Sequence, residues 1–344
     1  MTDIKDVAAR AGVSVATVSR VLNANPRVSS ATRERVVAAM EELGYRPNAV
    51  ARSLRIDETR VLGLVLGDIL NPFFTALARG VEDEARTAGY TVVICNADED
   101  PDEQDHYVRV LLEQQVDGLL LCPTAEVTSM VRAAVRSAKP LVFVDRVLPE
   151  LDVPSARVDG TAAIHALVAH LRDLGYRRIA FISGPPTLST GRERSALFLE
   201  AMRANGLATR PEYLEAGDFR AASGREITAR FLALPEPPEV IVVGDNLMTL
   251  GALDAVRERG LHIPADMAIA SYDDVPWFAH LDPPMTAISQ PVAELGARAV
   301  RTLLELIRTR TASSTVLSAS LVVRRSCGEP PAGRANAEDE KEIR

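Results

Sequence analysis

Short apolar runs alternate with helical patterns along most of the chain from residue 61 onward. The runs VLGLVLGDI, YTVVICNA and VDGLLLCP are separated by amphipathic segments, and the alternation returns after residue 160 with RIAFIS, EVIVVGD and MAIASYDD. Continuous Val, Ile and Leu strands joined by helices are typical of parallel sheets covered on both faces. The sequence therefore predicts an α/β core of two successive doubly wound lobes with a cleft between them.

Length and composition fit such a core with room for a further small unit. The chain has 344 residues, of which 47% are hydrophobic and 25% charged, as in a soluble globular protein. No apolar run reaches the ~20 residues that span a bilayer, and the polar start predicts no signal peptide. The cysteines are few and odd in number, and Cys95 and Cys122 lie in apolar runs where we expect buried thiols. We expect a cytoplasmic protein with no membrane partner.

Residues 4–23, IKDVAARAGVSVATVSRVLN, contain two helical patterns that meet at Gly12. Gly12 can adopt the positive φ that ends a helix, and Ser14 occupies an N-cap position. The expected apolar stripes comprise Ile4, Val7, Ala8 and Ala11 in the first helix and Val18, Val21 and Leu22 in the second. A tight helix–turn–helix of this length is the unit that presents a helix to the DNA major groove.

The second helix has a polar and small-residue face that the apolar stripe leaves free. Its candidate DNA contacts are Ser14, Val15, Ala16, Thr17, Ser19 and Arg20. Arg20 can form a bidentate hydrogen-bond pair with a guanine edge, and the methyl groups of Val15 and Ala16 fit a thymine methyl. The short hydroxyl side chains suit phosphate oxygens, which set register. For this segment alone, an ordinary solvated helical hairpin is the alternative.

A third helix is predicted from Ala31 to Leu43, with Gly44 closing it. Its expected apolar side comprises Val36, Val37, Met40 and Leu43. Three short helices can share one small core, so residues 1–46 are predicted to form a headpiece. Residues 47–59 follow as a hinge helix and linker.

The hinge segment PNAVARSLR, residues 47–55, offers about two helical turns, too few to persist alone in water. It is either an ordinary linker or a helix that folds on DNA and places an apolar wedge in a minor-groove step. Val50 and Leu54 lie four apart and form its apolar edge, and Ala51, Leu54 and Arg55 are the hinge residues expected at the DNA.

The basic residues are concentrated where DNA would be met. Residues 1–60 hold ten Lys and Arg against seven Asp and Glu, whereas the rest holds 29 against 40. This modest excess predicts weak binding by one headpiece. Two headpieces in a homodimer would add avidity and read a palindromic double-stranded site.

Aromatic and hydrogen-bonding side chains gather at the predicted strand ends. They are Asp68, Asn71, Phe73, Phe74, Asp145, Arg146, Arg194, Phe219, Asp245, Asn246, Asp273, Asp274 and Trp277. Aromatic faces with Asp and Arg groups suit a hydroxyl-rich ring such as a sugar. The alternative is that the loop carboxylates, Asp245 and Asp273 among them, cap helices and turns.

Two other classes of protein are weighed against a DNA-binding regulator. A soluble sugar receptor would share the two-lobed core, but it should carry a secretory segment and no basic headpiece. An enzyme is disfavoured because no GxSxG, P-loop or GxGxxG follows a strand, and no catalytic set is assembled. The five histidines lack zinc-ligand spacing, so we expect no metal and no cofactor.

The chain resembles the LacI family of bacterial transcription regulators over almost its whole length. The matching motifs are DVAARAGVSVATVSRVLN, RPNAVARSL, NPFFTALARGVEDEA, HLRDLGYRRIAFISGP, NLMTLGAL, YDDVPWFAHLDPPMTAISQP, LGARAV and LVVRRSC. The resemblance implies a periplasmic-binding-protein-like core over residues 60–327 and a dimer on a palindromic operator. It implies base contacts from Val15, Ala16 and Arg20, with Leu54 wedged at the central operator step. It also implies a small effector, often a sugar or sugar derivative, bound at the positions of Phe73, Phe74, Asp145, Arg194, Phe219, Asp245, Asp273 and Trp277.

Three departures from the family pattern limit what the resemblance implies. The family's common Asn-Asp pair is reversed here as Asp245-Asn246, so the hydroxyl pattern of the ligand can differ. The Val15-Ala16 pair is wholly apolar. Residues 328–344 are polar with no leucine heptad, which predicts a disordered tail and a dimer. Whether the effector acts as an inducer that releases a repressor or as a corepressor stays open.

Overall fold

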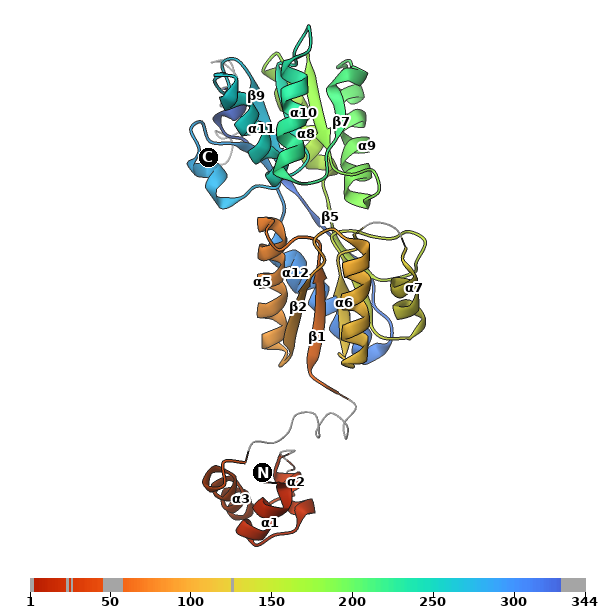
Figure 1. Ribbon diagram of the computed structural model, residues 1–344, viewed down its shortest axis with the longest axis vertical. Helices are drawn as coiled ribbons and strands as arrows, with labels where there is room; N and C mark the ends of the chain where they lie inside the picture. The colour runs from red at the N-terminus through yellow and green to blue at the C-terminus, as the bar shows by residue number, and fades with distance from the viewer. Residues whose placement is uncertain (1–2, 23–24, 26, 46–57, 125–126, 329–344) are drawn as a thin grey trace, which may run out of the picture. The chain divides into compact units, whose positions relative to one another are not determined.

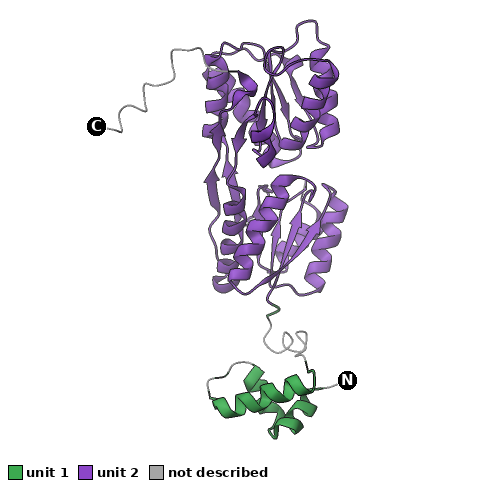
Figure 2. Ribbon diagram, turned by 90° about the vertical axis from the view of Figure 1, so that its left-hand side faces the viewer, with its two compact units in different colours: residues 1–59 green, residues 60–344 purple. Residues whose placement is uncertain are grey.

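The computed structural model describes residues 3–22, 25, 27–45, 58–124 and 127–328 (Figure 1). The chain divides into two units, Met1–Thr59 and Arg60–Arg344, which Figure 2 distinguishes by colour. Residues 47–57 of the predicted hinge, with Ala51, Leu54 and Arg55, lie outside the described residues. So do residues 329–344 of the predicted tail.

The first unit contains three helices, α1 (Ile4–Ala11), α2 (Val15–Leu22) and α3 (Ser30–Glu42). Helix α1 begins at Asp3, whose carboxylate accepts backbone hydrogen bonds from Lys5 and Asp6, and it ends at Gly12 with φ 62°. The Ser14 hydroxyl accepts from the Thr17 amide at the start of α2, as predicted. The shared core comprises Val7, Ala8, Ala11, Val18, Val21, Val36 and Ala39.

The predicted apolar side of α3 was wrong at one position. Val36 is fully buried, whereas the Val37 side chain is 42% exposed. Successive helical residues lie about 100° apart around the axis, so a narrow buried stripe cannot hold both. Ala39, in the third turn of α3, belongs to the shared core instead. Its short side chain allows α3 to pack closely on α1.

The first lobe of the second unit is built on a six-stranded sheet in the order β11-β5-β4-β3-β1-β2, and every pair is parallel. Its strands are β1 (Val61–Leu66), β2 (Thr91–Asn96), β3 (Gly118–Leu121), β4 (Leu141–Val144), β5 (Ser155–Asp159) and β11 (Thr315–Ser318). Its helices are α5 (Pro72–Thr87), α6 (Pro101–Glu113), α7 (Ser129–Arg136) and α12 (Val292–Thr309). Alternate strand residues such as Leu64 and Val65 pack on opposite helix layers, α5 with α12 and α6 with α7.

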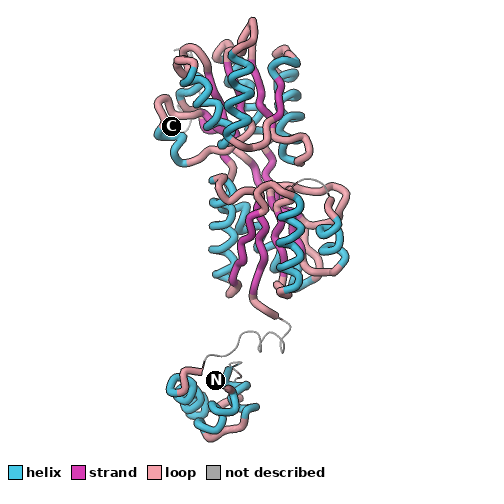
Figure 3. The backbone as a smooth tube through the Cα atoms, in the orientation of Figure 1, coloured by secondary structure: helices cyan, strands magenta, loops and turns pink. Residues whose placement is uncertain are grey.

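The second lobe repeats this architecture with the order β12-β10-β9-β8-β6-β7. Its strands are β6 (Ile179–Ser183), β7 (Leu214–Ala216), β8 (Val240–Val243), β9 (Ala268–Tyr272), β10 (Thr286–Ser289) and β12 (Ser320–Val322). Its helices are α8 (Thr161–Asp173), α9 (Ser189–Ala204), α10 (Ala221–Leu232) and α11 (Asn246–Glu258), with 3-10 turns η1 (Pro211–Tyr213), η2 (Pro276–His280) and η3 (Arg325–Cys327). The edge strand β12 is antiparallel to β10. In Figure 3 the strands form the centre of each lobe with helices outside.

The lobes are interleaved in sequence, which corrects the expectation of two successive units. The chain passes from β5 in the first sheet to α8 on the second, and it returns after β10 so that α12 packs on α5 of the first lobe. It crosses again between β11 and β12. The crossings lie at residues 159–161, 289–292 and 318–320. Three short connections therefore join the lobes, which is the geometry of a hinge.

Close helix pairing in each lobe depends on glycines. A Cβ on Gly251 of α11 would lie 1.8 Å from the Ala221 carbonyl oxygen of α10, and one on Gly80 of α5 would lie 2.3 Å from the Ala293 carbonyl oxygen of α12. These two glycines thus allow each helix pair to pack with backbone in contact.

The expected burial of Cys95 and Cys122 is confirmed. Among the described residues, no helix has the length and apolar character that crossing a membrane requires.

Candidate functional site

The predicted DNA face of the first unit lies at the surface of α2. Ser14, Val15, Ala16 and Arg20 are exposed, with Val15 at 40%, and Thr17 and Ser19 are partly exposed. Exposed Val15, Ala16 and Arg20 are free to contact base edges, which a base-reading face requires. These residues therefore remain our prediction for contact with DNA.

Arg33 is a positioning residue that the sequence analysis did not identify. From α3, its guanidinium donates to the Val21 carbonyl at 3.4 Å and to the Asn25 carbonyl at 3.1 Å, and both carbonyls lie at the C-terminal end of α2 or just beyond it. Cations are favourable at helix C-termini, where carbonyls lack partners. Arg33 thereby fixes the angle between α2 and α3. The sequence signal that could have found it is its spacing. Arg33 lies three residues before Val36, so it is on the same side of α3 as that buried valine.

The second unit has a polar cavity between its lobes, at the carboxyl ends of the strands. It is lined by Asn71, Phe73, Phe74, Asp145, Arg146, Thr190, Arg194, Phe219, Asp245 and Asp273. The structure thus brings together all the predicted effector residues except Trp277. Trp277 lies in η2, is 47% exposed and is not among the lining residues. The cavity holds about 20 Å³, room for about one water.

Three lining residues have backbone conformations that only glycine adopts freely. Asp145, Phe219 and Asp273 have φ values of 66°, 64° and 69°. Such conformations cost of order 1–3 kcal/mol each and cluster at functional sites. Each residue follows a strand closely, so the turn of the backbone directs its side chain to the cavity. Gly184 makes space for the Phe219 ring, whose Cζ would lie 2.0 Å from a Cβ there.

Arg146 is held rigidly in the first lobe, although the sequence analysis did not include it among the effector positions. Its two terminal nitrogens donate to both Glu99 carboxylate oxygens at 2.6 and 2.8 Å. Its guanidinium also lies over the rings of Phe74 and Phe219, at 5.5 and 5.7 Å from their centroids. A bidentate, stacked arginine of this kind is preorganised. Because Phe219 belongs to the second lobe, the stack bridges the cleft.

Arg194 is the corresponding cation of the second lobe. It lies in the second turn of α9 rather than at its start, and it donates to the Gly244 carbonyl at 2.7 Å and to Asp273 at 3.5 Å. Its guanidinium lies 3.7 Å from the Tyr272 ring centroid. Asp273 also accepts from the Gln290 amide. The capping alternative for Asp273 is therefore not what the structure shows, since its carboxylate binds side chains.

Burial raises the pKa of each cavity carboxylate. Desolvation is the largest cause for all three: it raises the pKa of Asp145 to about 6 and of Asp245 to about 7, and it raises that of Asp273. Asp245 also caps α11, because its carboxylate accepts from the Met248 amide at 2.8 Å. Both interpretations of Asp245 are thus combined in one residue.

These shifts predict how stability depends on pH. A carboxyl whose folded-state pKa lies above its unfolded value of ~3.9 contributes stability that is present below that value and lost as pH rises through the folded pKa. For Asp245 the loss falls between about pH 4 and pH 7. The isosteric variant Asp245→Asn should remove this part of the decline. Urea unfolding across that range, compared with wild type, measures it, and parallel curves for the two proteins would contradict it.

Direct contacts hold the lobes together around the cavity. The Asn71 amide donates to Asp245 at 3.3 Å, and the Asn246 amide donates to the Asn71 oxygen at 2.9 Å. The Ser189 hydroxyl accepts from the Val147 amide, and Arg220 pairs with Asp98 at the cleft edge. Asn71 also caps α5 through the Phe73 amide. The structure is therefore a closed arrangement, which must open to admit a ligand.

Asn71→Ser should loosen this closure while keeping a capping oxygen. The shorter side chain cannot reach Asp245, and hydrogen bonds of this kind contribute about 0.5–1.5 kcal/mol each. We expect hydrogen exchange at the residue 246–248 amides to rise by about two- to tenfold, since each 1.4 kcal/mol is a factor of ten. Asn205→Ser, at the C-cap of α9 and not among the residues that line the cavity, is the matched control. Equal exchange in both variants would exclude Asn71 as a latch.

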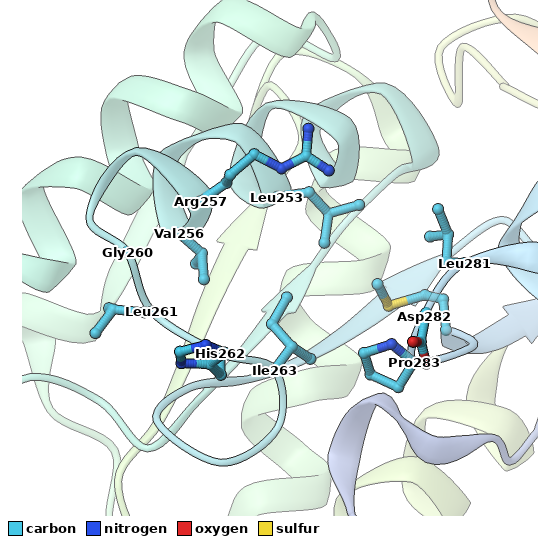
Figure 4. A pocket seen from close by; sticks show the side chains of 11 residues that line it. Leu253, Val256, Arg257, Gly260, Leu261, His262, Ile263, Leu281, Asp282 and Pro283 are labelled. Carbon is cyan, nitrogen blue, oxygen red and sulfur yellow. The ribbon is translucent and has the colours of Figure 1, made fainter.

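A larger hollow of about 600 Å³ lies within the second lobe (Figure 4). Its floor includes buried Val256 and Met285, and its charged residues, Arg257, His262 and Asp282, are exposed. It holds none of the buried charges or strained residues that mark the interlobe cavity. The interlobe cavity is therefore the better ligand site.

Among the described residues, no group of three or more His, Cys, Asp or Glu could hold a metal ion.

Two family models match this chain. A family model described as bacterial regulatory proteins, lacI family, matches residues 3–48, and one described as a periplasmic binding protein-like domain matches residues 168–327. The chain is 35% identical over 315 residues to catabolite control protein A of Priestia megaterium, covering 91% of this chain and 95% of that protein. It is 32% identical over 325 residues to the transcriptional repressor CytR of Escherichia coli K12, covering 94% and 95%.

Solved structures extend the likeness to the full architecture. The lac repressor dimer bound to operator and the anti-inducer ONPF superposes with a TM-score of 0.85 at 31% identity, covering 95% of this chain and 99% of that one. The complex of the transcriptional regulator CelR with cellobiose gives 0.72 at 31%, covering 95% and 100%. The chain belongs to the LacI family and is a ligand-responsive, DNA-binding transcriptional repressor.

Proposed function

We propose that this protein binds a palindromic operator as a homodimer in the cytoplasm, and that a sugar-like effector in the interlobe cavity releases it. The observation that carries the proposal is the set of buried polar side chains drawn from both lobes, on the same chain as an exposed recognition helix. The solved relatives support it, since one is a dimer on operator DNA and another holds cellobiose. The role is regulatory, with no catalytic step.

On the operator side, α2 supplies sequence reading and anchoring. Val15, Ala16 and Arg20 are assigned to base edges, and the hydroxyls of Ser14, Thr17 and Ser19 to phosphates. The start of α2 adds backbone amides that favour a phosphate. Two such helices in a dimer would meet half-sites about one helical turn apart.

On the effector side, the ligand must bind one orientation of the lobes better than the other. The closed arrangement is stabilised by direct contacts such as Asn71 with Asp245, and a ligand that replaces them shifts the equilibrium. The lobe movement would act on the hinge segments, residues 47–59, whose helix is marginal alone. A coupling free energy of ~1–3 kcal/mol is enough to change operator occupancy.

The opposite sign, in which the ligand is a corepressor, uses the same parts. Relatives named PurR match at similar identity, for example 35% over 310 residues for that of Aliivibrio salmonicida. The deciding experiment is a thermal-shift screen of sugars, sugar phosphates and purines on the full chain. Each ligand that binds is then added to an operator titration. Weaker operator binding establishes induction, stronger binding establishes corepression, and a ligand with no effect refutes the regulatory proposal.

Leu54→Ala tests the proposed hinge wedge. Loss of an apolar wedge between base steps should weaken specific operator binding, because the bent DNA that it stabilises is no longer favoured. Effector affinity should stay unchanged, since Leu54 lies outside the second unit. Gel-shift titration measures the first quantity and calorimetry the second. Operator affinity equal to that of wild type would exclude the wedge.

A further inference from the structure

The interlobe cavity leaves hydrogen-bond acceptors without donors. No hydrogen bond to the Asp145 carboxylate is present among the described residues, and its nearest cationic atom, Arg146 Nε, is 3.7 Å away. Asn246 Oδ1 and Thr190 Oγ1 are also buried without partners in the described structure. Buried acceptors of this kind are normally satisfied. Arg146 Nε, a donor, is buried without a partner as well. The ligand that completes the cavity must therefore bring donors for the carboxylate and amide oxygens, together with an acceptor such as a hydroxyl for Arg146.

The charges around the cavity are also unbalanced. Three acidic side chains, Asp145, Asp245 and Asp273, line it against the two guanidiniums of Arg146 and Arg194, and Glu99 pairs with Arg146. Arg146 is committed to Glu99 by two short hydrogen bonds, and Arg194 to Asp273 and the Gly244 carbonyl.

Among the residues that the structure describes, neither Asp145 nor Asp245 has a cation within hydrogen-bonding distance. Arg220 at the cleft edge is already paired with Asp98. An anionic ligand would add to this excess of negative charge, whereas a cation would offset it.

We propose that the effector is an amino sugar, whose protonated amine lies between Asp145 and Asp245. Its ring hydroxyls would bind Arg194, Asp273 and Asn246, and its apolar ring face would pack on the aromatic rings. An ammonium group has three donors and no acceptor, which matches the unpaired acceptors of the cavity. Phosphorylated sugars are excluded by the same charges. This inference rests on the proposed effector site and narrows its ligand class.

The test uses the full chain with matched ligand sets on one ring. Glucosamine, glucose and glucose 6-phosphate form the first set, with galactose and mannose sets built in the same way. At pH 7.5 and low salt, at least one amino sugar should raise the melting temperature and bind about tenfold or more tighter than its neutral partner, because buried charge pairs couple strongly. The phosphate should give no shift.

Asp145→Asn separates the charge from the shape of the site. The variant should lose about tenfold in amino-sugar affinity and less than about threefold in affinity for the neutral partner. Asp83→Asn, on the surface of α5 and not among the residues that line the cavity, is the matched control and should change neither. The empty Asp145→Asn protein should also melt higher than wild type, because the variant removes a buried carboxylate that accepts no hydrogen bond and whose desolvation outweighs its attraction to Arg146.

Three results would overturn the amino-sugar proposal: no amino sugar binds, a neutral sugar binds as tightly as its amino partner in every set, or the phosphate binds best. A lower melting temperature for empty Asp145→Asn would also count against it, since the carboxylate would then be structurally paired. A neutral sugar that binds and alters operator affinity would leave the proposed function intact. Only a bound ligand without effect on operator binding would remove both.

Discussion

Arg194→Ala is expected to lower the free energy of unfolding of the second unit by about 3–5 kcal/mol, the usual cost of removing one partner from a buried ion pair. The guanidinium is 9% exposed and donates to both Asp273 and the Gly244 carbonyl. Its loss leaves both acceptors buried without their donor. Effector binding should be lost as well, because the hydroxyl groups of the ligand lose a fixed cationic donor.

Urea unfolding of the full chain, followed by circular dichroism, measures this loss. Arg298→Ala is the matched control, since Arg298 pairs with Glu294 on the surface of α12 with about half of each side chain exposed. Exposed pairs contribute about 0–1 kcal/mol, so the control should unfold almost as wild type does. Similar losses in the two variants would mean that the buried cluster stabilises the closed core no more than a surface pair does.

Arg20→Ala is expected to have the largest effect on DNA binding. A bidentate contact with a guanine contributes about 1–3 kcal/mol of discrimination, or roughly five- to 150-fold in affinity for each half-site. In a homodimer both half-sites lose it, so specific binding should fall by the product of the two factors. Binding to non-specific DNA should change little, because that depends mainly on the number of phosphate contacts.

Fluorescence anisotropy with operator and scrambled DNA at fixed salt separates these two effects. Arg10→Ala is the control for charge alone, because Arg10 lies on α1 and pairs with Glu42 of α3. A uniform loss on both DNAs in Arg20→Ala would show that Arg20 contacts phosphate. Because a uniform loss leaves the ratio of specific to non-specific binding unchanged, that result would reject the assignment of Arg20 to a base edge.

The sequence predicted helix ends and turns well wherever a single local interaction determines the structure. Gly12 and Ser14 set the helix–turn–helix through backbone sterics and capping, and both predictions were confirmed. The strand ends at Asp145, Asp245 and Asp273 were located by apolar runs, and parallel strands place such ends at one edge. For the same reason most of the residues that line the cavity could be predicted from the sequence.

Features that depend on long-range packing could not be predicted in this way. The return of α12 to the first lobe follows from chain crossings, which no periodicity encodes. Arg146 was mentioned only beside Asp145, because its pairing with Glu99 joins residues 47 apart in sequence. Asn71 and Thr190 are polar residues at helix starts, where capping is the simpler expectation. Trp277 was expected in the cavity from its proximity to Asp273, but η2 leaves it at the surface.

The central claim is that occupancy of the interlobe cavity controls the affinity of the headpiece for DNA. Its most direct test is the operator dissociation constant of the full chain with and without a saturating ligand from the thermal-shift screen, repeated with Asp273→Asn. We predict a change of about five- to 150-fold in the wild type, which corresponds to a coupling of ~1–3 kcal/mol. In the variant, at the same ligand concentration, the change should disappear while operator affinity without ligand is kept. An operator dissociation constant that the bound ligand leaves unchanged in the wild type would contradict the claim.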